Sequence, residues 1–209
     1  MDSSRDTVIE WAIRLQSIAQ NGLAYCSNKY DRQRYEELRN LAAEMMTEKS
    51  GVSLQKVKDL FCCEKGYQTP KIDTRAAIVK NQRILLVEQD GKWSLPGGWA
   101  EVNLSVAENC LKENKEETGL DTVVDKVVAL QEYNLHNQPP LSPFGICKIF
   151  FLCHAIAGQF HQNIETQGYD YFSFDQVSRL NLNTRRSTLE QINMCFAAAK
   201  DPYWSTKWD

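Results

Sequence analysis

The spacing of apolar residues changes at Pro70, and this change constrains the fold more than any other feature of the chain. Before Pro70, apolar residues recur at steps of three and four, which is the repeat of an amphipathic helix. The repeat predicts helices at 7–20, at about 31–49 and from Ser53 onward. We therefore expect the chain to begin with a small helical module.

Local signals indicate where these helices begin and end. Asn21-Gly22 is expected to end the first helix, and Asp31 is expected to serve as the N-cap of the second. The apolar stripes are too few to build an independent core. The module, over 1–65, should therefore pack on the rest of the chain or on a second subunit.

After Pro70 the sequence reads as an α+β domain over 70–209. Strand-like runs alternate with a few helical segments, and Lys80-Asn81-Gln82 is typical of a hairpin turn between two strands. The predicted strands are 72–79, 83–89, 148–157 and 169–174, with a further strand-like run from Thr122, and the predicted helices are 105–118 and about 187–199.

Charge and composition exclude several classes of protein. The 24 Lys and Arg residues face 27 Asp and Glu residues, so the net charge is −3, which argues against a dedicated nucleic-acid binder. No apolar run approaches the ~20 residues that cross a bilayer, so no membrane association is expected. The seven cysteines are scattered and the start lacks a signal-peptide pattern, which predicts a cytoplasmic protein with reduced thiols.

The acidic excess gathers in one segment, 101–125, with seven acids and two bases. Ser105 and Glu108 form a capping-box pattern that starts a helix, and Gly119 is placed to end it. On this helix three glutamates stand at i, i+3 and i+4, which puts their carboxylates on one face. They are Glu113, Glu116 and Glu117.

The loop before this helix, Leu-Pro-Gly-Gly-Trp over 95–99, changes how the glutamates are interpreted. Three glutamates alone would more often form a solvated acidic face. Glycines let a backbone approach a ligand closely, and its carbonyls can join carboxylates around a hard cation. The combination favours a site for Mg²⁺, or for Mn²⁺ in its place, with phosphate oxygens completing the coordination shell.

These residues resemble the Nudix box, G-x5-E-x7-R-E-U-x-E-E-x-G-U, with U an aliphatic residue. Gly98 opens the motif, and the residues in register after it are Glu113, Glu116, Glu117, Gly119 and Leu120. Three positions depart from it, where Leu104 replaces the first Glu, Lys112 the Arg, and Asn114 an aliphatic residue. Asn114 should face the packed side of the helix, where an amide needs a partner.

The resemblance implies a Nudix α/β/α sandwich and a metal-dependent hydrolysis of a diphosphate. It places cations on Glu113 and Glu117 with help from the Gly97 carbonyl, and it gives Glu116 a metal-binding or orienting role. The general base varies among Nudix families. Glu165 is the first candidate here and Glu101 the second, although Glu165 could equally be a solvated loop acid.

Candidates for substrate contacts are less specific. Arg75 could clamp a phosphate, but pairing with Asp73 or another acid is at least as reasonable. Three further residues could contact a base or sugar, and packing or surface roles are the alternatives. They are Trp99, Tyr133 and His136.

The whole chain is similar to a bacterial-type Nudix subgroup with an N-terminal helical module. The resemblance implies a homodimer that hydrolyses CDP-choline, nucleotide-sugars or ADP-ribose, and CDP-choline is favoured among them. Two alternatives stay open. One is a Nudix enzyme that trims RNA ends, although the sequence offers no basic track for RNA. The other is a non-catalytic ligand sensor, although a sensor has no need of the metal carboxylates.

Overall fold

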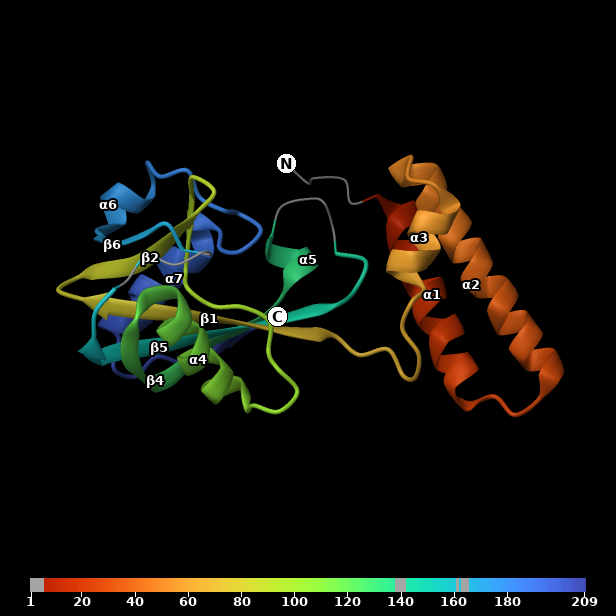
Figure 1. Cartoon of the computed structure of the whole chain (residues 1–209), viewed down its shortest axis with the longest axis horizontal. Coiled ribbons are helices and arrows are strands. Elements are labelled where there is room, and N and C mark those ends of the chain that lie inside the picture. The colour runs from red at the N-terminus through yellow and green to blue at the C-terminus, as the bar shows by residue number, and fades with distance from the viewer. Residues whose placement is uncertain (1–5, 138–141, 161, 163–165) are drawn as a thin grey trace. The chain divides into compact units, whose positions relative to one another are not determined.

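The computed structural model describes residues 6–137, 142–160, 162 and 166–209. The chain divides into two compact units, a helical unit (Met1–Thr69) and an α/β unit (Pro70–Asp209). The two are described separately. The helical unit contains α1 (Thr7–Tyr25), α2 (Lys29–Ser50) and α3 (Leu54–Phe61), coloured red to orange in Figure 1.

The helical unit is a packed helix pair with a short third helix. Its core is small and includes Ala42, Ala43, Val57 and Phe61. Two expectations about helix ends were wrong. The first helix continues through Asn21-Gly22 to Tyr25, and Gly22 serves as a packing position, because a Cβ there would lie 2.3 Å from the Tyr35 ring. The second helix begins earlier, and Asn28 rather than Asp31 caps it.

The α/β unit is built on a mixed sheet with the strand order β3-β2-β1-β5-β4-β7, and β6 pairs with β2. β1 and β5 are parallel, whereas β4 and β5 are antiparallel. The strands are β1 (Lys71–Lys80), β2 (Arg83–Gln89), β3 (Lys92–Ser94), β4 (Leu120–Glu132), β5 (Ile146–Gly158), β6 (Gly168–Phe172) and β7 (Lys207–Trp208). The helices are α4 (Val106–Thr118), α5 (Tyr133–His136), α6 (Phe174–Val177) and α7 (Leu189–Lys200).

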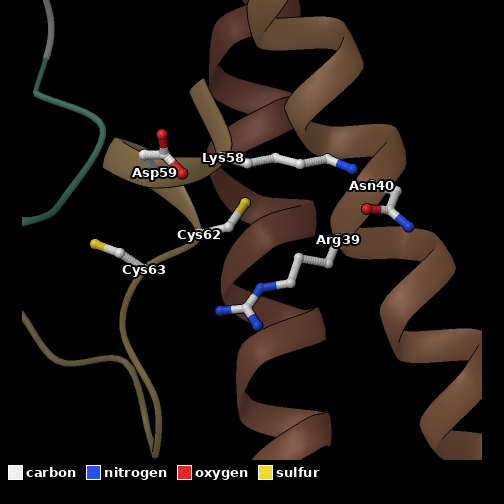
Figure 2. A pocket seen from close by; sticks show the side chains of 6 residues that line it. All are labelled: Arg39, Asn40, Lys58, Asp59, Cys62 and Cys63. Atoms are coloured by element: carbon white, nitrogen blue, oxygen red, sulfur yellow. The ribbon is translucent and has the colours of Figure 1, made fainter. Parts of the chain in front are cut away.

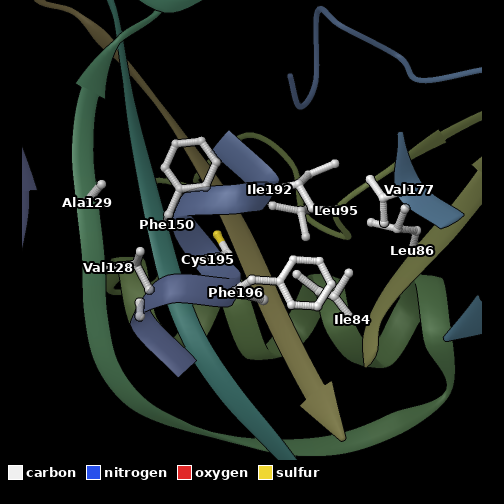
Figure 3. Packing of buried hydrophobic residues seen from close by; sticks show 12 residues of the cluster. Ile84, Leu86, Leu95, Val128, Ala129, Phe150, Val177, Ile192, Cys195 and Phe196 are labelled. Atoms are coloured by element: carbon white, nitrogen blue, oxygen red, sulfur yellow. The ribbon is translucent and has the colours of Figure 1, made fainter. Parts of the chain in front are cut away.

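Alternate residues of β1 serve opposite faces of the sheet. Ala77 joins a cluster with residues of α7 such as Ile192 and Phe196, which Figure 3 shows beside the strands. Ala76 joins a second cluster with Cys110 of α4. Helices therefore cover both faces, and the expected α/β/α sandwich is confirmed.

Two global features agree with the composition. Within the described residues, no helix combines the length and apolar character that spanning a bilayer requires. All seven cysteines are free thiols.

Candidate active site

The loop that follows β3 runs alongside the first half of β1. The amides of Thr74 and Ala76 donate to the carbonyls of Gly98 and Pro96, at 2.8 and 2.9 Å. Gly97, between them, has φ of 136°. A Cβ on Gly97 would lie 1.9 Å from the Thr74 carbonyl oxygen, so only glycine fits this approach.

Helix α4 is fixed at both ends as predicted. The capping box of Ser105 and Glu108 is present, and Gly119 closes the helix in the left-handed conformation with φ of 71°. Asn109 ties the helix to the strand and loop, because its amide donates to Thr74 Oγ1 and its oxygen accepts the Glu101 amide. The face of α4 that was predicted to carry the three glutamates is therefore held against the glycine loop.

Asn114 is buried on this helix, on its packed side as expected. Its Nδ2 donates to Thr122 Oγ1 at 2.9 Å, so the amide has found a side-chain partner. Its oxygen has no partner among the described residues. An unpaired buried acceptor costs about 1–3 kcal/mol of stability, so this departure from the Nudix box is expected to be destabilising.

Glu117 is the most enclosed carboxylate of the site, with 2% of its surface exposed. Its Oε2 accepts the Gly97 amide at 2.7 Å. Its Oε1 accepts Gln89 Nε2 and Arg186 Nη1, both at 3.1 Å. The charge of this buried carboxylate is therefore compensated by one arginine and two neutral donors.

Glu113 stands one turn earlier and faces the same loop. A Cβ added to Gly98 would lie 2.6 Å from Glu113 Oε2, so the second glycine makes room for this carboxylate. Burial raises the pKa of Glu113, and the negative charge of Glu117 raises it further. A half-buried carboxylate beside another carboxylate is stabilised by a cation, because the added charge favours the ionised form.

Lys112 supplies a cation to the outer carboxylates. Its ammonium pairs with Glu116, and it lies 3.3 Å from Glu101 and 3.7 Å from Glu113. These pairings raise the pKa of Lys112, with the hydrogen bond to Glu116 as the main cause. The lysine at the arginine position of the motif thus keeps the charge and gathers three acids.

The donor set fits a hard divalent cation. Carboxylate oxygens from one helix face and a close backbone loop are the ligands that Mg²⁺ and Mn²⁺ prefer. Among the described residues, no three Asp, Glu, His or Cys side chains stand close enough to hold a metal ion as they are. Lys112 and Arg186 pair instead with Glu116 and Glu117. A cation at this place would compete with these pairings.

Arg75 does not occupy the position expected of a phosphate clamp. Its guanidinium is buried and makes a two-bond pair with Asp73, at 3.0 and 2.7 Å, and a third bond to the Leu95 carbonyl. The alternative considered from sequence, pairing with Asp73, describes the structure. The guanidinium is therefore committed to the protein rather than to a ligand.

The other substrate candidates differ in their exposure and partners. Trp99 is 56% exposed and its backbone bridges to Asp73, so its ring is accessible near the loop. Tyr133 is buried. His136 pairs with Asp209. The first candidate for the base, Glu165, lies outside the described residues.

Comparison with known proteins agrees with this geometry. Residues 70–191 match the NUDIX domain model, and residues 6–61 match the model described as a UDP-X-like, N-terminal oligomerisation domain. The chain belongs to the Nudix hydrolase family. The resemblance inferred from the glycine loop and the three glutamates is confirmed, and the protein is an enzyme of the hydrolase class.

Two relatives match this chain over almost its whole length, and a third matches about two thirds of it. A putative ADP-ribose pyrophosphatase of Bacillus subtilis (strain 168), YjhB, is 42% identical over 203 residues, which is 96% of each chain. The crystal structure of a UDP-X diphosphatase is 32% identical, with a TM-score of 0.62, and the match covers 97% of this chain and 98% of that one. An ADP-ribose pyrophosphatase from Streptococcus suis is 41% identical with a TM-score of 0.62, over 68% of this chain and all of that one.

A separate groove lies in the helical unit (Figure 2). It has a volume of about 400 Å³ and is lined by Arg39, Asn40, Lys58, Asp59, Cys62 and Cys63. Burial raises the pKa of the Cys62 thiol, which opposes the thiolate form that a nucleophile needs. The groove therefore offers no catalytic set, and the chemistry of a Nudix hydrolase belongs to the α/β unit.

Three residues of the site were not found from the sequence. Gln89 and Arg186 reach Glu117, and Lys148 on β5 pairs in register with Asp73 and donates to the Arg186 carbonyl. A signal existed for Lys148, which is a lysine within the apolar run of a strand. Arg186 is 69 residues from its partner, and only the fold brings the two together.

Proposed function

We propose that this Nudix hydrolase is a metal-dependent diphosphatase that cleaves the diphosphate linkage of nucleoside diphosphate conjugates. The products are a nucleoside monophosphate and a phosphorylated second moiety. The observation that carries the proposal is the approach of Glu113 and Glu117 on α4 to the loop of Gly97 and Gly98. This arrangement provides anionic oxygens where a cation-bound diphosphate can be held.

Glu113 and Glu117 would hold the metal, with the Gly97 carbonyl and Glu116 as further ligands. Divalent cations bound there neutralise phosphate oxygens and lower the pKa of a coordinated water. The flanking carbonyls of Pro96 and Gly98 are engaged by β1, which fixes the peptide that carries Gly97. The chain must also accept a proton from the attacking water.

Candidates for this general base remain those inferred from sequence. Glu165 is the first. Glu101 is the second, and its amide is anchored by Asn109 while its side chain stays about half exposed beside Lys112. Glu116 could share this task, because it lies on the same face of α4. The pH–rate profiles of variants at these positions would identify the general base.

The names of the relatives support ADP-ribose and UDP-linked conjugates as the first substrates to test. CDP-choline, favoured from the sequence resemblance, shares the same diphosphate linkage and stays a prediction. Trp99 belongs to the loop and has an accessible ring, so it is the first candidate for stacking on a base.

We also infer that the helical unit joins two copies of the chain in a homodimer. Its family model is described as an oligomerisation domain. The unit exposes aromatic side chains that a second copy could cover, including Trp11 at 52% and Tyr25 at 76%. A cytoplasmic location is inferred from the sequence and needs a direct test.

The deciding experiment is a panel of substrates offered to the metal-loaded protein. ADP-ribose, a UDP-sugar, CDP-choline and a short RNA with a 5′-triphosphate are incubated with Mg²⁺ or Mn²⁺, and product monophosphates are quantified. The proposal expects nucleoside monophosphate from at least one conjugate and none after chelation. Turnover restricted to the RNA favours the RNA-processing alternative, and no turnover of any compound favours the sensor.

A further inference from the structure

We propose that Arg186 is the internal counter-cation of Glu117, that a divalent cation displaces it, and that it then pairs with the substrate's diphosphate. The inference rests on the proposed function for its last step. Its first step concerns metal binding alone, and it can be tested without any substrate.

The contact between the two side chains is asymmetric in burial. Glu117 is 2% exposed at the side chain, whereas Arg186 is 29% exposed and reaches inward with Nη1 to Glu117 Oε1, at 3.1 Å. A buried carboxylate requires a compensating charge, but a partly exposed guanidinium can be solvated. Of the two partners, Arg186 is therefore the one that can leave.

The backbone that carries Arg186 is fixed independently of this contact. Asn137 Nδ2 donates to the carbonyls of Thr184 and Arg185, at 2.7 and 3.2 Å. Lys148 Nζ donates to the carbonyls of Arg185 and Arg186. The side chain of Arg186 can therefore swing while its Cα remains in place.

Electrostatics determines the direction of the exchange. Glu113 and Glu117 stand one turn apart on α4, with Glu117 bonded to the Gly97 amide and Glu113 against Gly98, so both carboxylates face the same loop. A divalent cation between them compensates both, whereas Arg186 contacts Glu117. Once the cation is bound, the guanidinium faces like charge at short range and is repelled.

A released Arg186 remains tethered beside the metal ligands. The anion that the reaction brings to this place is the diphosphate, and a guanidinium donates two parallel hydrogen bonds to phosphate oxygens. Arg75 is committed to Asp73 and does not compete for this role. Arg186 thus takes the phosphate-binding role that the sequence had suggested for Arg75.

The first test measures Mn²⁺ binding to the metal-free, full-length protein by calorimetry, without substrate. Arg186→Gln should bind Mn²⁺ about five- to tenfold more tightly than wild type, because a competing cation is gone. Arg185→Gln is the matched control, since it removes one positive charge from the exposed neighbouring side chain. Its Mn²⁺ affinity should stay within about twofold of wild type.

An Arg186→Gln affinity equal to or weaker than that of wild type overturns the exchange, because it would mean that the arginine supports Glu117 as a ligand. Arg186→Lys serves if the glutamine variant fails to fold. Lysine keeps the positive charge but lacks the planar guanidinium that bonds Glu117. The Mn²⁺ affinity of this variant should therefore exceed that of wild type and lie below that of Arg186→Gln. A value at or below wild type again overturns the proposal.

The second test separates KM from kcat with ADP-ribose and saturating Mn²⁺. Arg186→Gln should raise KM by about tenfold or more and leave kcat within a few-fold, whereas Arg185→Gln should change neither. An unchanged KM overturns the substrate contact. Tighter Mn²⁺ binding in a protein that turns over no conjugate would retain the counter-cation and refute only the proposed function.

Discussion

Replacing Lys148 with methionine should change how the stability of the α/β unit depends on pH. The Lys148 side chain is fully buried between β5, β1 and the segment before α7. Its ammonium lies 3.6 Å from Asp73 and stands over the ring of Tyr133. Burial lowers the pKa of Lys148 from 10.5 to about 7. Asp73 opposes this shift, while Arg75 and Arg186 add to it.

The sign follows from comparing the folded and unfolded chains. Below pH 7 both hold the proton, so the cost of burying the ammonium is fully present. Between about pH 7 and 10.5 the folded chain has lost a proton that the unfolded chain retains, so stability rises with pH. From pH 7 to 9.5 this rise amounts to about 3 kcal/mol, since one pH unit is worth about 1.4 kcal/mol.

The assay is urea unfolding of wild type and Lys148→Met at pH 7, 8 and 9.5, followed by tryptophan fluorescence. Four of the five tryptophans follow Pro70, so the signal reports mainly on the α/β unit. Methionine does not titrate, so the difference between the unfolding free energies of the two proteins isolates the effect of Lys148. That difference should move in favour of wild type by about 3 kcal/mol as pH rises to 9.5.

Lys80→Met is the matched control, because it removes an exposed lysine from the same sheet. The reasoning is refuted if the difference between wild type and Lys148→Met stays constant, or falls, as pH rises. Either result would mean that the buried side chain holds its proton through this range, and that its neighbours compensate the charge fully.

Further predictions concern the glycine loop, the base and the helical unit. Gly98→Ala should leave the protein folded and weaken Mn²⁺ binding by about tenfold, because the added Cβ displaces the Glu113 carboxylate. Gly97→Ala should instead lower the melting temperature, because its Cβ would clash with the Thr74 backbone. Equal effects of the two substitutions would contradict this distinction. Glu165→Gln should lower kcat by roughly 10²–10⁴ and remove the acid limb of the pH–rate profile, and an unchanged profile would exclude it as the base. Deleting 1–65 should leave a monomeric or insoluble protein by light scattering, and a well-folded dimer would refute the role of the helical unit.

Local signals predicted the site's frame well. The capping box at Ser105, the stop at Gly119 and the strand at 72–79 each depend on residues close in sequence, and the structure confirms all three. The ends of the first two helices were less predictable. Gly22 reads as a stop signal, yet Tyr35 of the next helix packs against it and the helix continues.

The partners of the carboxylates depend on the fold and could not be predicted. Gln89 ends β2, before the glycine loop, and Arg186 lies far beyond the loop in the sequence, just before α7. Both side chains nevertheless reach Glu117. The partner of Arg75 could not be predicted for the same reason. Its position beside Asp73 allowed two roles, and the choice between them depended on how deeply β1 is buried.

The most direct test of the central claim is metal-dependent turnover of ADP-ribose by wild type and Glu117→Gln. The substitution keeps the shape of the side chain and removes the charge that would hold the cation. With Glu190→Gln, an exposed glutamate of α7, as the control, the Glu117 variant should lose at least about 10²-fold in kcat while keeping its circular dichroism spectrum. Activity within a few-fold of wild type at the same Mn²⁺ concentration would contradict the assignment of the metal site.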